Sequence, residues 1–288
     1  MSANVPKTKV ISTGYHPKLH YSIQGSGPPL LFLHGIPTSS LLWDKIAEKL
    51  SSDFTIICPD LPGWGKSPPI NKKGLDLLSE VVAMIDELGK EIGVKFNRLI
   101  GHDAGAVVAA HYAITHGDNV DDLVLMAAAI WPDINIPWPM RVLRTPIWGD
   151  IMSFLLKPMI FRHLGLMPPY RKLYTNRYRS SFSYPFRGPL GGLKLARQVR
   201  WGKRSKVLAP LAANLKNIKA RTLIIHSSGD SAVPYPLSLR SSEAIPNCRL
   251  LELDATHFVP LTHPDLLAEH LNNYFTHIDE PLGSKIKN

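Results

Sequence analysis

The stretch NRLIGHDAGAVVAA, residues 97–110, limits the possible folds of this chain more than any other segment. A short apolar run leads into Asp103, and an alanine-rich segment with a helical pattern follows at once. Small residues flank the acid on both sides, as a sharp strand-to-helix turn requires, because larger side chains there would collide with the neighbouring strand or helix. The pattern G-x-D-x-G therefore predicts a strand, a strained turn and a helix, with Asp103 raised at the carboxyl edge of a sheet.

Alternating strand and helix patterns surround this turn. Strands are predicted at 19–24, 29–35, 54–60, 97–101, 122–127, 221–230 and 248–253. Helical patterns occur at 75–93 and in the terminal segment PDLLAEHLNNYF, whereas the tail GSKIKN is expected to fray. Buried strands that alternate with helices are typical of an α/β fold, with a mostly parallel sheet covered by helices on both faces. A chain of 288 residues, 44% hydrophobic, can form one such domain with an insertion.

Residues 131–208 break this alternation and hold the positive charge of the chain. Prolines at 132, 137, 139, 146, 158, 168 and 169 predict several short helices joined by bends, with no long regular helix. The segment has 15 Lys and Arg against Asp133 and Asp150, a net charge of +13, whereas the whole chain carries +10. We therefore predict a core domain made of 1–130 and 209–288, and a basic helical cap, or lid, inserted at 131–208.

Three further segments lie where a nucleophile at Asp103 would need partners. The segment LHGIP follows a strand, so the backbone N–H groups of Ile36 and Ala104 are expected to form a two-donor oxyanion hole. Asp230 lies in the loop HSSGDSAVP after a later strand, and His257 lies in DATHFVP after the next one. The chain order nucleophile, acid, histidine is one of the known orders of a catalytic triad.

On these residues the chain resembles the α/β-hydrolase fold superfamily, in the aspartate-nucleophile branch that includes epoxide hydrolases and haloalkane or haloacetate dehalogenases. The segments HGIPTSSLLW, PDLPGWGKS, GHDAGA, LIIHSSGDSAVP and THFVPLTHPD occur in family order and span nearly the whole chain. The resemblance implies Asp103 as nucleophile, His257 as base and Asp230 as the acid that orients the base. An aspartate, with an ordinary pKa near 3.9, is ionised at neutral pH and suits displacement at a saturated carbon. His257 would then activate water against the resulting aspartyl ester.

The sequence defines the leaving group of the reaction less sharply than it defines the nucleophile. Haloalkane dehalogenases usually carry tryptophan after the nucleophile and often asparagine between HG and P, where this chain has Ala104 and Ile36. Haloacetate dehalogenases usually carry arginines close after the nucleophile, and the segment AGAVVAAHYA has none. Epoxide hydrolases use two lid tyrosines as proton donors, and Tyr170 and Tyr174 are the candidates here, although the late-lid segment GGLKLARQVRW offers none. We therefore favour hydrolysis of an epoxide to a diol, with dehalogenation as the alternative.

Two other classes of function stay open at this point. A catalytically silent α/β-hydrolase that binds a ligand is disfavoured by the complete set of Asp103, Asp230 and His257, and a non-hydrolytic enzyme such as a lyase is the remaining possibility. No motif for a cofactor, a metal or a nucleic acid is recognised, so we predict none of these. His34 and His102, which flank the proposed site, are expected to form hydrogen bonds with the backbone.

The same sequence predicts the setting in which the protein works. The basic cap, with its segment IMSFLLKPMIF, predicts lipophilic substrates, including anionic ones, or a weak contact with a membrane surface. No signal-peptide pattern opens the chain, and no apolar stretch approaches roughly 20 residues. Cys58 and Cys248, both in apolar runs, are interpreted as packing residues. We predict a cytoplasmic protein, and the sequence leaves open whether it is a monomer or a homodimer.

Overall fold

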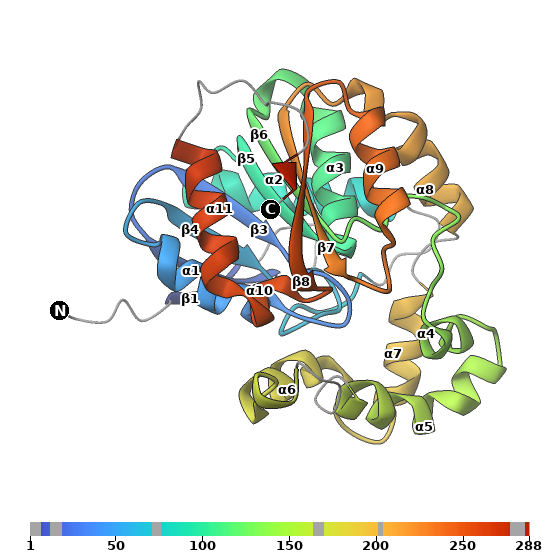
Figure 1. The fold of residues 1–288 in the computed structure, drawn as a ribbon. Helices are drawn as coiled ribbons and strands as arrows, with labels where there is room; N and C mark the ends of the chain where they lie inside the picture. The colour runs from blue at the N-terminus through green and yellow to red at the C-terminus, as the bar shows by residue number, and fades with distance from the viewer. Residues whose placement is uncertain are drawn as a thin grey trace.

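The computed structural model describes residues 7–11, 19–70, 76–163, 170–200, 204–276 and 286–287. A twisted β-sheet forms its centre, helices cover both faces of the sheet, and a further layer of helices lies beneath one edge (Figure 1). Within the described residues the sheet has nine strands in the order β1-β2-β4-β3-β5-β6-β7-β8-β9. The pairs β1–β2 and β2–β4 are antiparallel and all other neighbouring pairs are parallel. The predicted fold class, a mostly parallel sheet with helices on both faces, is confirmed.

The strands are β1 (Lys7–Ile11), β2 (Leu19–Gly25), β3 (Pro29–Leu33), β4 (Thr55–Pro59), β5 (Arg98–His102), β6 (Asp122–Met126), β7 (Arg221–Gly229), β8 (Cys248–Thr256) and β9 (Ile286–Lys287). The α-helices are α1 (Asp44–Leu50), α2 (Leu77–Ile92), α3 (Ala104–His116), α4 (Trp138–Leu143), α5 (Trp148–His163), α6 (Asn176–Phe182), α7 (Gly191–Val199), α8 (Arg204–Ala213), α9 (Tyr235–Ala244), α10 (Val259–Thr262) and α11 (Pro264–Thr276). The short 3₁₀ helices are η1 (Ser40–Trp43), η2 (Gly117–Asn119), η3 (Tyr170–Lys172), η4 (Tyr184–Phe186) and η5 (Leu215–Asn217).

The central strands form the core of the molecule. Leu30, Leu31, Phe32 and Leu33 of β3 are fully buried, as expected of a strand with a helix layer on each side. The predicted strands agree with β2 to β8 within two residues at every end except the end of β8, which runs to Thr256. The tail is not simply frayed, because Ile286 pairs with Leu251 and extends the sheet along the open edge of β8.

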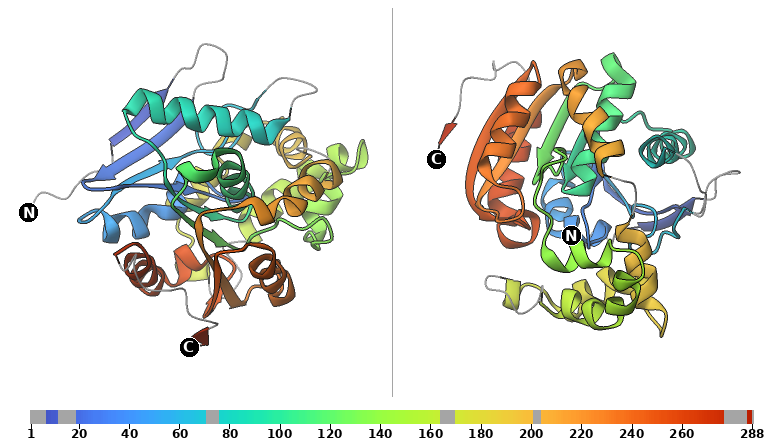
Figure 2. Two further views of the ribbon diagram at one scale, coloured as in Figure 1. Left: turned by 90° about the horizontal axis from the view of Figure 1, so that it is seen from above. Right: turned by 90° about the vertical axis from the view of Figure 1, so that its right-hand side faces the viewer.

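Amphipathic helices cover the two faces of this sheet. In α2 the buried side chains are Leu78, Val81, Val82, Met84, Ile85 and Leu88, a spacing that gives one apolar stripe along the helix. The Asp76 carboxylate accepts a hydrogen bond from the Leu78 N–H and so caps its first turn. Figure 2 shows α2 and α3 together on one face, with α1 and α11 on the other.

The chain between β6 and β7 carries the extra layer of helices. Helices α4 to α7 lie together beneath the carboxyl edge of the sheet, whereas α8 lies alongside the core (Figures 1 and 2). The prediction of only short helices here is wrong, since α5 has 16 residues and contains Pro158. A proline removes one backbone hydrogen bond, but the helix buries Leu156 and Ile160, and packing against α7 offsets that loss. The cap boundaries, 131–208, stay a prediction.

Candidate active site

Asp103 lies directly between β5 and α3, in a strained backbone conformation. Its φ of 51° and ψ of −115° fall in a region that side-chain-bearing residues rarely adopt. Glycines make this turn possible: a Cβ on Gly105 would approach the Leu33 carbonyl oxygen to 2.1 Å, and one on Gly101 would approach the Ala106 Cα to 2.5 Å. The glycines of the G-x-D-x-G pattern therefore allow the helix to pack tightly against its neighbouring strands.

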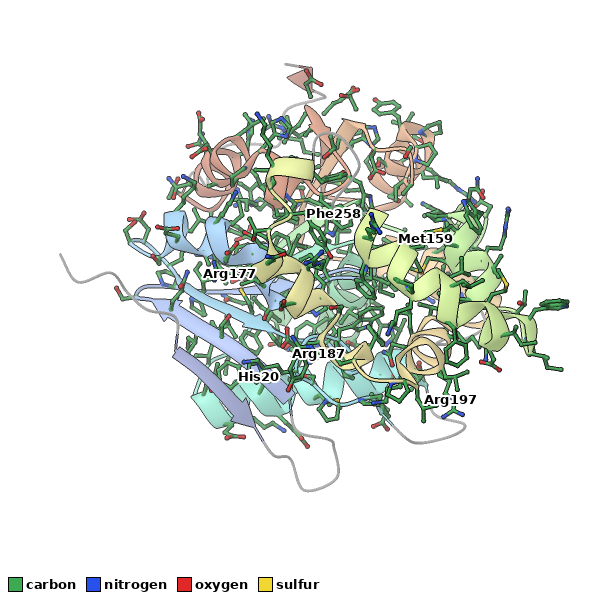
Figure 3. The ribbon with its side chains drawn as sticks, turned by 90° about the horizontal axis from the view of Figure 1, so that it is seen from below. His20, Met159, Arg177, Arg187, Arg197 and Phe258 are labelled. Carbon is green, nitrogen blue, oxygen red and sulfur yellow. The ribbon has the colours of Figure 1, made fainter. Side chains whose placement is uncertain are left out.

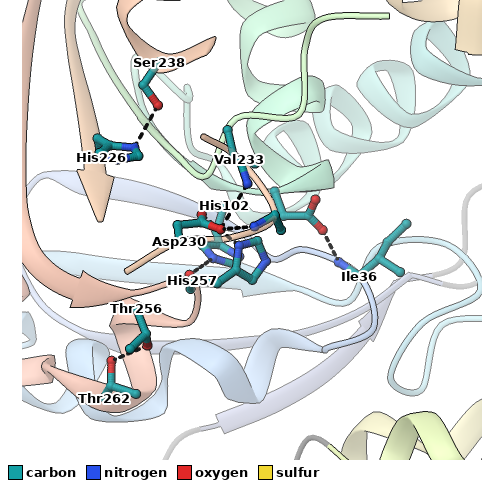
Figure 4. Close-up of polar contacts among 11 residues, drawn as sticks. Ile36, His102, His226, Asp230, Val233, Ser238, Thr256, His257 and Thr262 are labelled. Carbon is teal, nitrogen blue, oxygen red and sulfur yellow. Dashed lines mark hydrogen bonds and ion pairs between the residues drawn. The ribbon is translucent and has the colours of Figure 1, made fainter. Parts of the chain in front are cut away.

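Two backbone amides bind the Asp103 carboxylate. The N–H of Ile36 donates to Oδ2 at 2.9 Å (Figure 4). The N–H of Ala104 also donates to this carboxylate, which lowers its pKa. A Cβ on Gly35 would lie 2.5 Å from Cβ and 2.9 Å from Oδ2 of Asp103, so only glycine permits this approach. The two donors predicted from the sequence thus lie at the carboxylate of the predicted nucleophile.

Buried polar residues hold the loop that carries Ile36. His34 accepts a hydrogen bond from the Leu61 N–H at its Nε2, 2.9 Å, and its Nδ1 donates to the Gly35 carbonyl oxygen at 2.9 Å. Burial lowers the pKa of His34, so the ring stays neutral. Asp60, also buried, accepts from the Ser40 N–H at 2.8 Å. The expected backbone hydrogen bonding of His34 is confirmed, whereas the part played by Asp60 was not predicted.

His257 and Asp230 form a hydrogen-bonded pair from two neighbouring loops. Nδ1 of His257 lies 2.9 Å from Oδ2 of Asp230, while the other carboxylate oxygen accepts from the backbone N–H groups of Ala232 and Val233 at 2.8 and 3.0 Å (Figure 4). Burial alone would raise the pKa of Asp230, but the hydrogen bond and charge of His257 and the two amides lower it overall. Asp230 is therefore ionised and orients the His257 ring.

The pKa values of Asp103 and His257 are linked through charge. Desolvation raises the pKa of Asp103 above its ordinary value, although His257 and the Ile36 and Ala104 amides oppose this. Desolvation would lower the pKa of His257, but the hydrogen bond and charge of Asp230 and the charge of Asp103 raise it overall. Each group thus stabilises the ionised form of the other. A poorly solvated carboxylate beside a histidine held by an acid is suited to nucleophilic attack followed by base catalysis.

His102 supports His257 from behind. Its Nε2 donates to the His257 carbonyl oxygen at 2.7 Å, and the two ring centroids lie 5.0 Å apart. Burial and, less strongly, the charge of His257 lower the pKa of His102 to about 3, so the ring is neutral. The expected backbone hydrogen bond of His102 is confirmed, but the sequence did not show that its acceptor is His257.

The two predicted cap tyrosines lie together around one small cavity that also contacts Phe258, the residue after His257. They line a cavity of about 10 Å³, enough for one water molecule, with Phe182, Phe258 and Leu261. The Tyr170 ring lies 5.5 Å from that of Phe258, which in turn lies 4.7 Å from His257. Phe258 therefore joins the tyrosine cavity to the histidine, a role that its position beside His257 could have suggested.

The hydroxyl groups of these tyrosines differ in their partners. Burial raises the pKa of Tyr170, and hydrogen bonds from Thr256 and the Phe258 amide partly offset this. The Tyr174 hydroxyl is buried and has no hydrogen-bond partner within the described ranges. Desolvation raises the pKa of Tyr174 well above its ordinary value. The Tyr178 hydroxyl donates to Asp44 at 2.7 Å. Tyr174 thus has a donor that a bound ligand can use.

The remaining sequence predictions concern metals, membranes and thiols. No group of three or more His, Cys, Asp or Glu residues that could hold a metal ion occurs among the residues with described placement. None of the helices in those ranges combines the length and the apolar character that crossing a bilayer requires. Cys58 is buried in β4, and Cys248 is partly buried at the start of β8; both thiols are free.

The fold and the site together define a hydrolase built on a mostly parallel sheet, with an elbow between strand and helix. The chain belongs to the alpha/beta hydrolase fold family, whose model matches residues 28–264.

Known relatives and structures differ in their named activities. A pimeloyl-[acyl-carrier protein] methyl ester esterase of Vibrio vulnificus is 24% identical over 267 residues, 89% of this chain and 97% of the relative. A soluble epoxide hydrolase of a Corynebacterium species is 34% identical over 129 residues, 44% of this chain and 43% of the relative. The structure of a candidate epoxide hydrolase from Pseudomonas aeruginosa, in a mutant form, superposes with a TM-score of 0.80 at 23% identity and covers 96% of this chain and 98% of its own.

Proposed function

We propose that this hydrolase opens epoxides to diols through a covalent ester on Asp103. The observation that carries the proposal is an aspartate at the elbow whose Oδ2 is held by the Ile36 amide, next to the His257–Asp230 pair. Serine esterases place serine at this position. A carboxylate that attacked an ester carbonyl would form an anhydride, which is more reactive than the ester itself. At a saturated carbon the same attack forms an ordinary ester, which the site can then hydrolyse.

In the first step one carboxylate oxygen of Asp103 forms a bond to a ring carbon of the epoxide, and the bond from that carbon to the ring oxygen breaks. The opening oxygen takes a proton from a cap tyrosine, and Tyr174 is our candidate because its buried hydroxyl has no partner in the described parts of the chain. Its raised pKa keeps the hydroxyl protonated in the resting enzyme, as a donor requires. Tyr170 is the second candidate, with a hydroxyl that is already engaged.

In the second step His257 removes a proton from water, and the resulting hydroxide attacks the carbonyl carbon of the Asp103 ester. Negative charge develops on the carbonyl oxygen of Asp103, within reach of the Ile36 and Ala104 amides. As this intermediate collapses, the bond from the Asp103 carbonyl carbon to the substrate oxygen breaks, the proton of the attacking hydroxyl passes to that oxygen, and the diol leaves with the Asp103 carboxylate restored. The proton taken up by His257 then returns to the tyrosinate left by the first step, so both groups regain their starting states. Asp230 holds the His257 ring in place during both proton transfers.

Intact-protein mass spectrometry of His257→Ala tests this proposal, because removal of the base should trap the ester. A terminal epoxide adds its whole mass to the protein, whereas a haloalkane adds its mass less that of the hydrogen halide. We expect whole-mass adducts that map to Asp103, and none in the control variant His257→Ala with Asp103→Asn. Turnover by the wild-type enzyme in heavy-oxygen water should label the Asp103 carboxylate. If neither an adduct nor labelling is found with a broad epoxide panel, the mechanism is wrong.

A further inference from the structure

The outward side of α5 carries a row of large apolar side chains in contact with solvent. We call this the α5 row; its members are Ile147, directly before the helix, and Trp148, Ile151, Phe154 and Leu155 within it, with exposed fractions from 51% for Phe154 to 73% for Ile147. Within α5, the spacing of Trp148, Ile151, Phe154 and Leu155 by three and four residues places them along one side of the helix. The opposite side is buried through Leu156 and Ile160. Contiguous exposed apolar surface of this kind marks an interaction site on a globular protein.

A cationic groove adjoins the C-terminal end of this row. It has a volume of about 360 Å³, lies between α5, α6 and η4, and is lined by Lys157, Arg162, Arg179 and Arg187, with Phe161 and Phe186 as apolar walls. Figure 3, which views the molecule from the side of the cap, labels Arg187, one of the cations that line the groove. Cations and aromatic rings thus share one hollow in the surface.

The positive charge of this groove is not neutralised by acids. Within the described part of the chain, none of its four cations forms an ion pair. Lys157 donates instead to the Phe186 carbonyl oxygen at 3.2 Å, and Arg187 donates to that of Ser180 at 3.4 Å. Such contacts with neutral carbonyl groups leave the charges available to an anionic partner.

The only two acids of the segment 131–208 are already paired. Asp150 forms an ion pair with Arg200 at 2.8 Å, and Asp133 forms one with Arg240 at 3.2 Å. The surface around the α5 row therefore presents positive charge without a compensating acid. A second copy of this chain is a poor occupant of the row, because two strongly basic caps would have to meet.

We propose that the α5 row and the cationic groove together dock the protein on the surface of an anionic phospholipid bilayer. The α5 row enters the interface between head groups and acyl chains, as the apolar side of an amphipathic helix does. Lys157, Arg162, Arg179 and Arg187 bind lipid phosphates beside it. A small soluble anion would fill the groove but leave the apolar row uncovered, so a lipid surface accounts for both features. The proposal is independent of the reaction at Asp103, because the groove and the row contain none of the candidate catalytic residues.

Flotation of the full-length protein with lipid vesicles tests this docking surface. We expect binding to vesicles of phosphatidylcholine mixed with phosphatidylglycerol, and little binding to phosphatidylcholine alone. The variant Lys157→Gln with Arg187→Gln should weaken partition roughly 25-fold, roughly fivefold for each charge lost. The variant Phe154→Ser with Leu155→Ser should weaken it roughly tenfold. The matched control, Lys95→Gln with Lys216→Gln, removes two exposed cations of the core and should stay within about twofold of the wild type.

Two measurements separate loss of docking from loss of structure. Circular dichroism should show unchanged thermal melting for all of these variants, and Phe154→Leu should keep the vesicle binding that Phe154→Ser with Leu155→Ser loses. Equal binding to neutral and anionic vesicles, or unaltered binding by the groove and row variants, would overturn the proposal. Self-association that the Phe154→Ser, Leu155→Ser variant abolishes, in a protein that ignores vesicles, would instead identify a second copy as the occupant.

Discussion

The backbone N–H of Ile36 lies 2.9 Å from Oδ2 of Asp103, so the donor expected to stabilise an oxyanion already binds the resting carboxylate. Under the proposed mechanism, Oδ2 stays with the Ile36 amide and Oδ1 is the oxygen left to attack a substrate. The backbone donor is in place before any reaction begins, which is the condition for electrostatic stabilisation without reorganisation. The arrangement depends on Gly35, whose missing side chain leaves room for the Asp103 carboxylate.

Gly35→Ala should therefore inactivate the enzyme without unfolding it. The new Cβ would lie 2.5 Å from Cβ of Asp103, so the nucleophile must shift. Displacements of this order cost about 100-fold in rate, and we expect such a fall in kcat/KM with a substrate found by the trapping experiment. The control is Gly117→Ala, where no atom lies within 4 Å of the new Cβ. Its backbone, with φ 51° and ψ −117°, is in the same rarely adopted region as that of Asp103, so we expect a loss of about 1–3 kcal/mol in urea unfolding but normal activity. Normal activity of Gly35→Ala would contradict the assigned geometry.

Removal of the Tyr174 hydroxyl should affect catalysis and stability in opposite directions. Tyr174→Phe deletes a buried hydroxyl that has no partner in the described ranges, so the free energy of unfolding should stay constant or rise by up to about 1 kcal/mol. The rate of ester formation, followed by rapid quench, should fall about 100-fold if Tyr174 donates the proton.

Tyr170→Phe is the matched comparison for this pair. It removes a hydroxyl whose pKa the neighbouring Thr256 and Phe258 amide lower, so we expect the free energy of unfolding to fall rather than rise. If ester formation slowed only in Tyr170→Phe, the donor assignment would pass to Tyr170.

The sequence predicted that the site residues which follow strands lie close together. It could not predict the hydrogen-bond partners of the cap tyrosines, because these depend on how the cap packs. Ile36, Asp103, Asp230 and His257 each follow a strand, and the carboxyl ends of parallel strands meet at one edge of the sheet. Their proximity therefore follows from local pattern and fold class. The difference between the hydroxyl groups of Tyr170 and Tyr174 depends on tertiary contacts of the cap, which leave no periodic signal.

Helix α5 shows the same limit for secondary structure. The density of prolines predicted short helices, since proline removes a backbone donor. In the structure the helix continues through Pro158, because its buried side gains more from packing than one hydrogen bond is worth. His102 is a similar case: the sequence showed a histidine next to the nucleophile, but its bond to the His257 carbonyl joins residues 155 positions apart.

The hydrogen bond from His102 to the His257 carbonyl should matter to stability more than to pH dependence. His102→Leu leaves this buried carbonyl without its donor, so we expect a loss of about 1–3 kcal/mol in the free energy of unfolding by urea. His102→Gln offers an N–H donor and should recover part of the loss. Because the pKa of His102 is about 3, the pH profile of the reaction should keep its shape in His102→Gln. A new ionisation in that profile would show that His102 titrates.

The charge of Asp103 should be visible in the titration of His257. Asp103 is one of the groups that raise the pKa of His257, and ester formation removes its charge. Asp103→Asn imitates this neutral state, so the midpoint of the His257 titration, measured by NMR, should fall below that of the wild type. Asp230→Asn should lower it too, since it removes both a charge and the hydrogen bond at Nδ1. The control is Asp133→Asn, an exposed acid paired with Arg240, which should leave the midpoint unchanged.

The same linkage sets the pH dependence of the two chemical steps. Ester formation needs ionised Asp103, so its rate should fall as the pH drops through the raised pKa of this carboxyl. Ester hydrolysis needs neutral His257, so its rate should rise with pH and level off above the pKa of the intermediate. Because the ester carries no charge, single-turnover measurements should place that rise at lower pH than the His257 midpoint of the free enzyme. A rise at or above the free-enzyme midpoint would show that Asp103 does not hold the proton on His257.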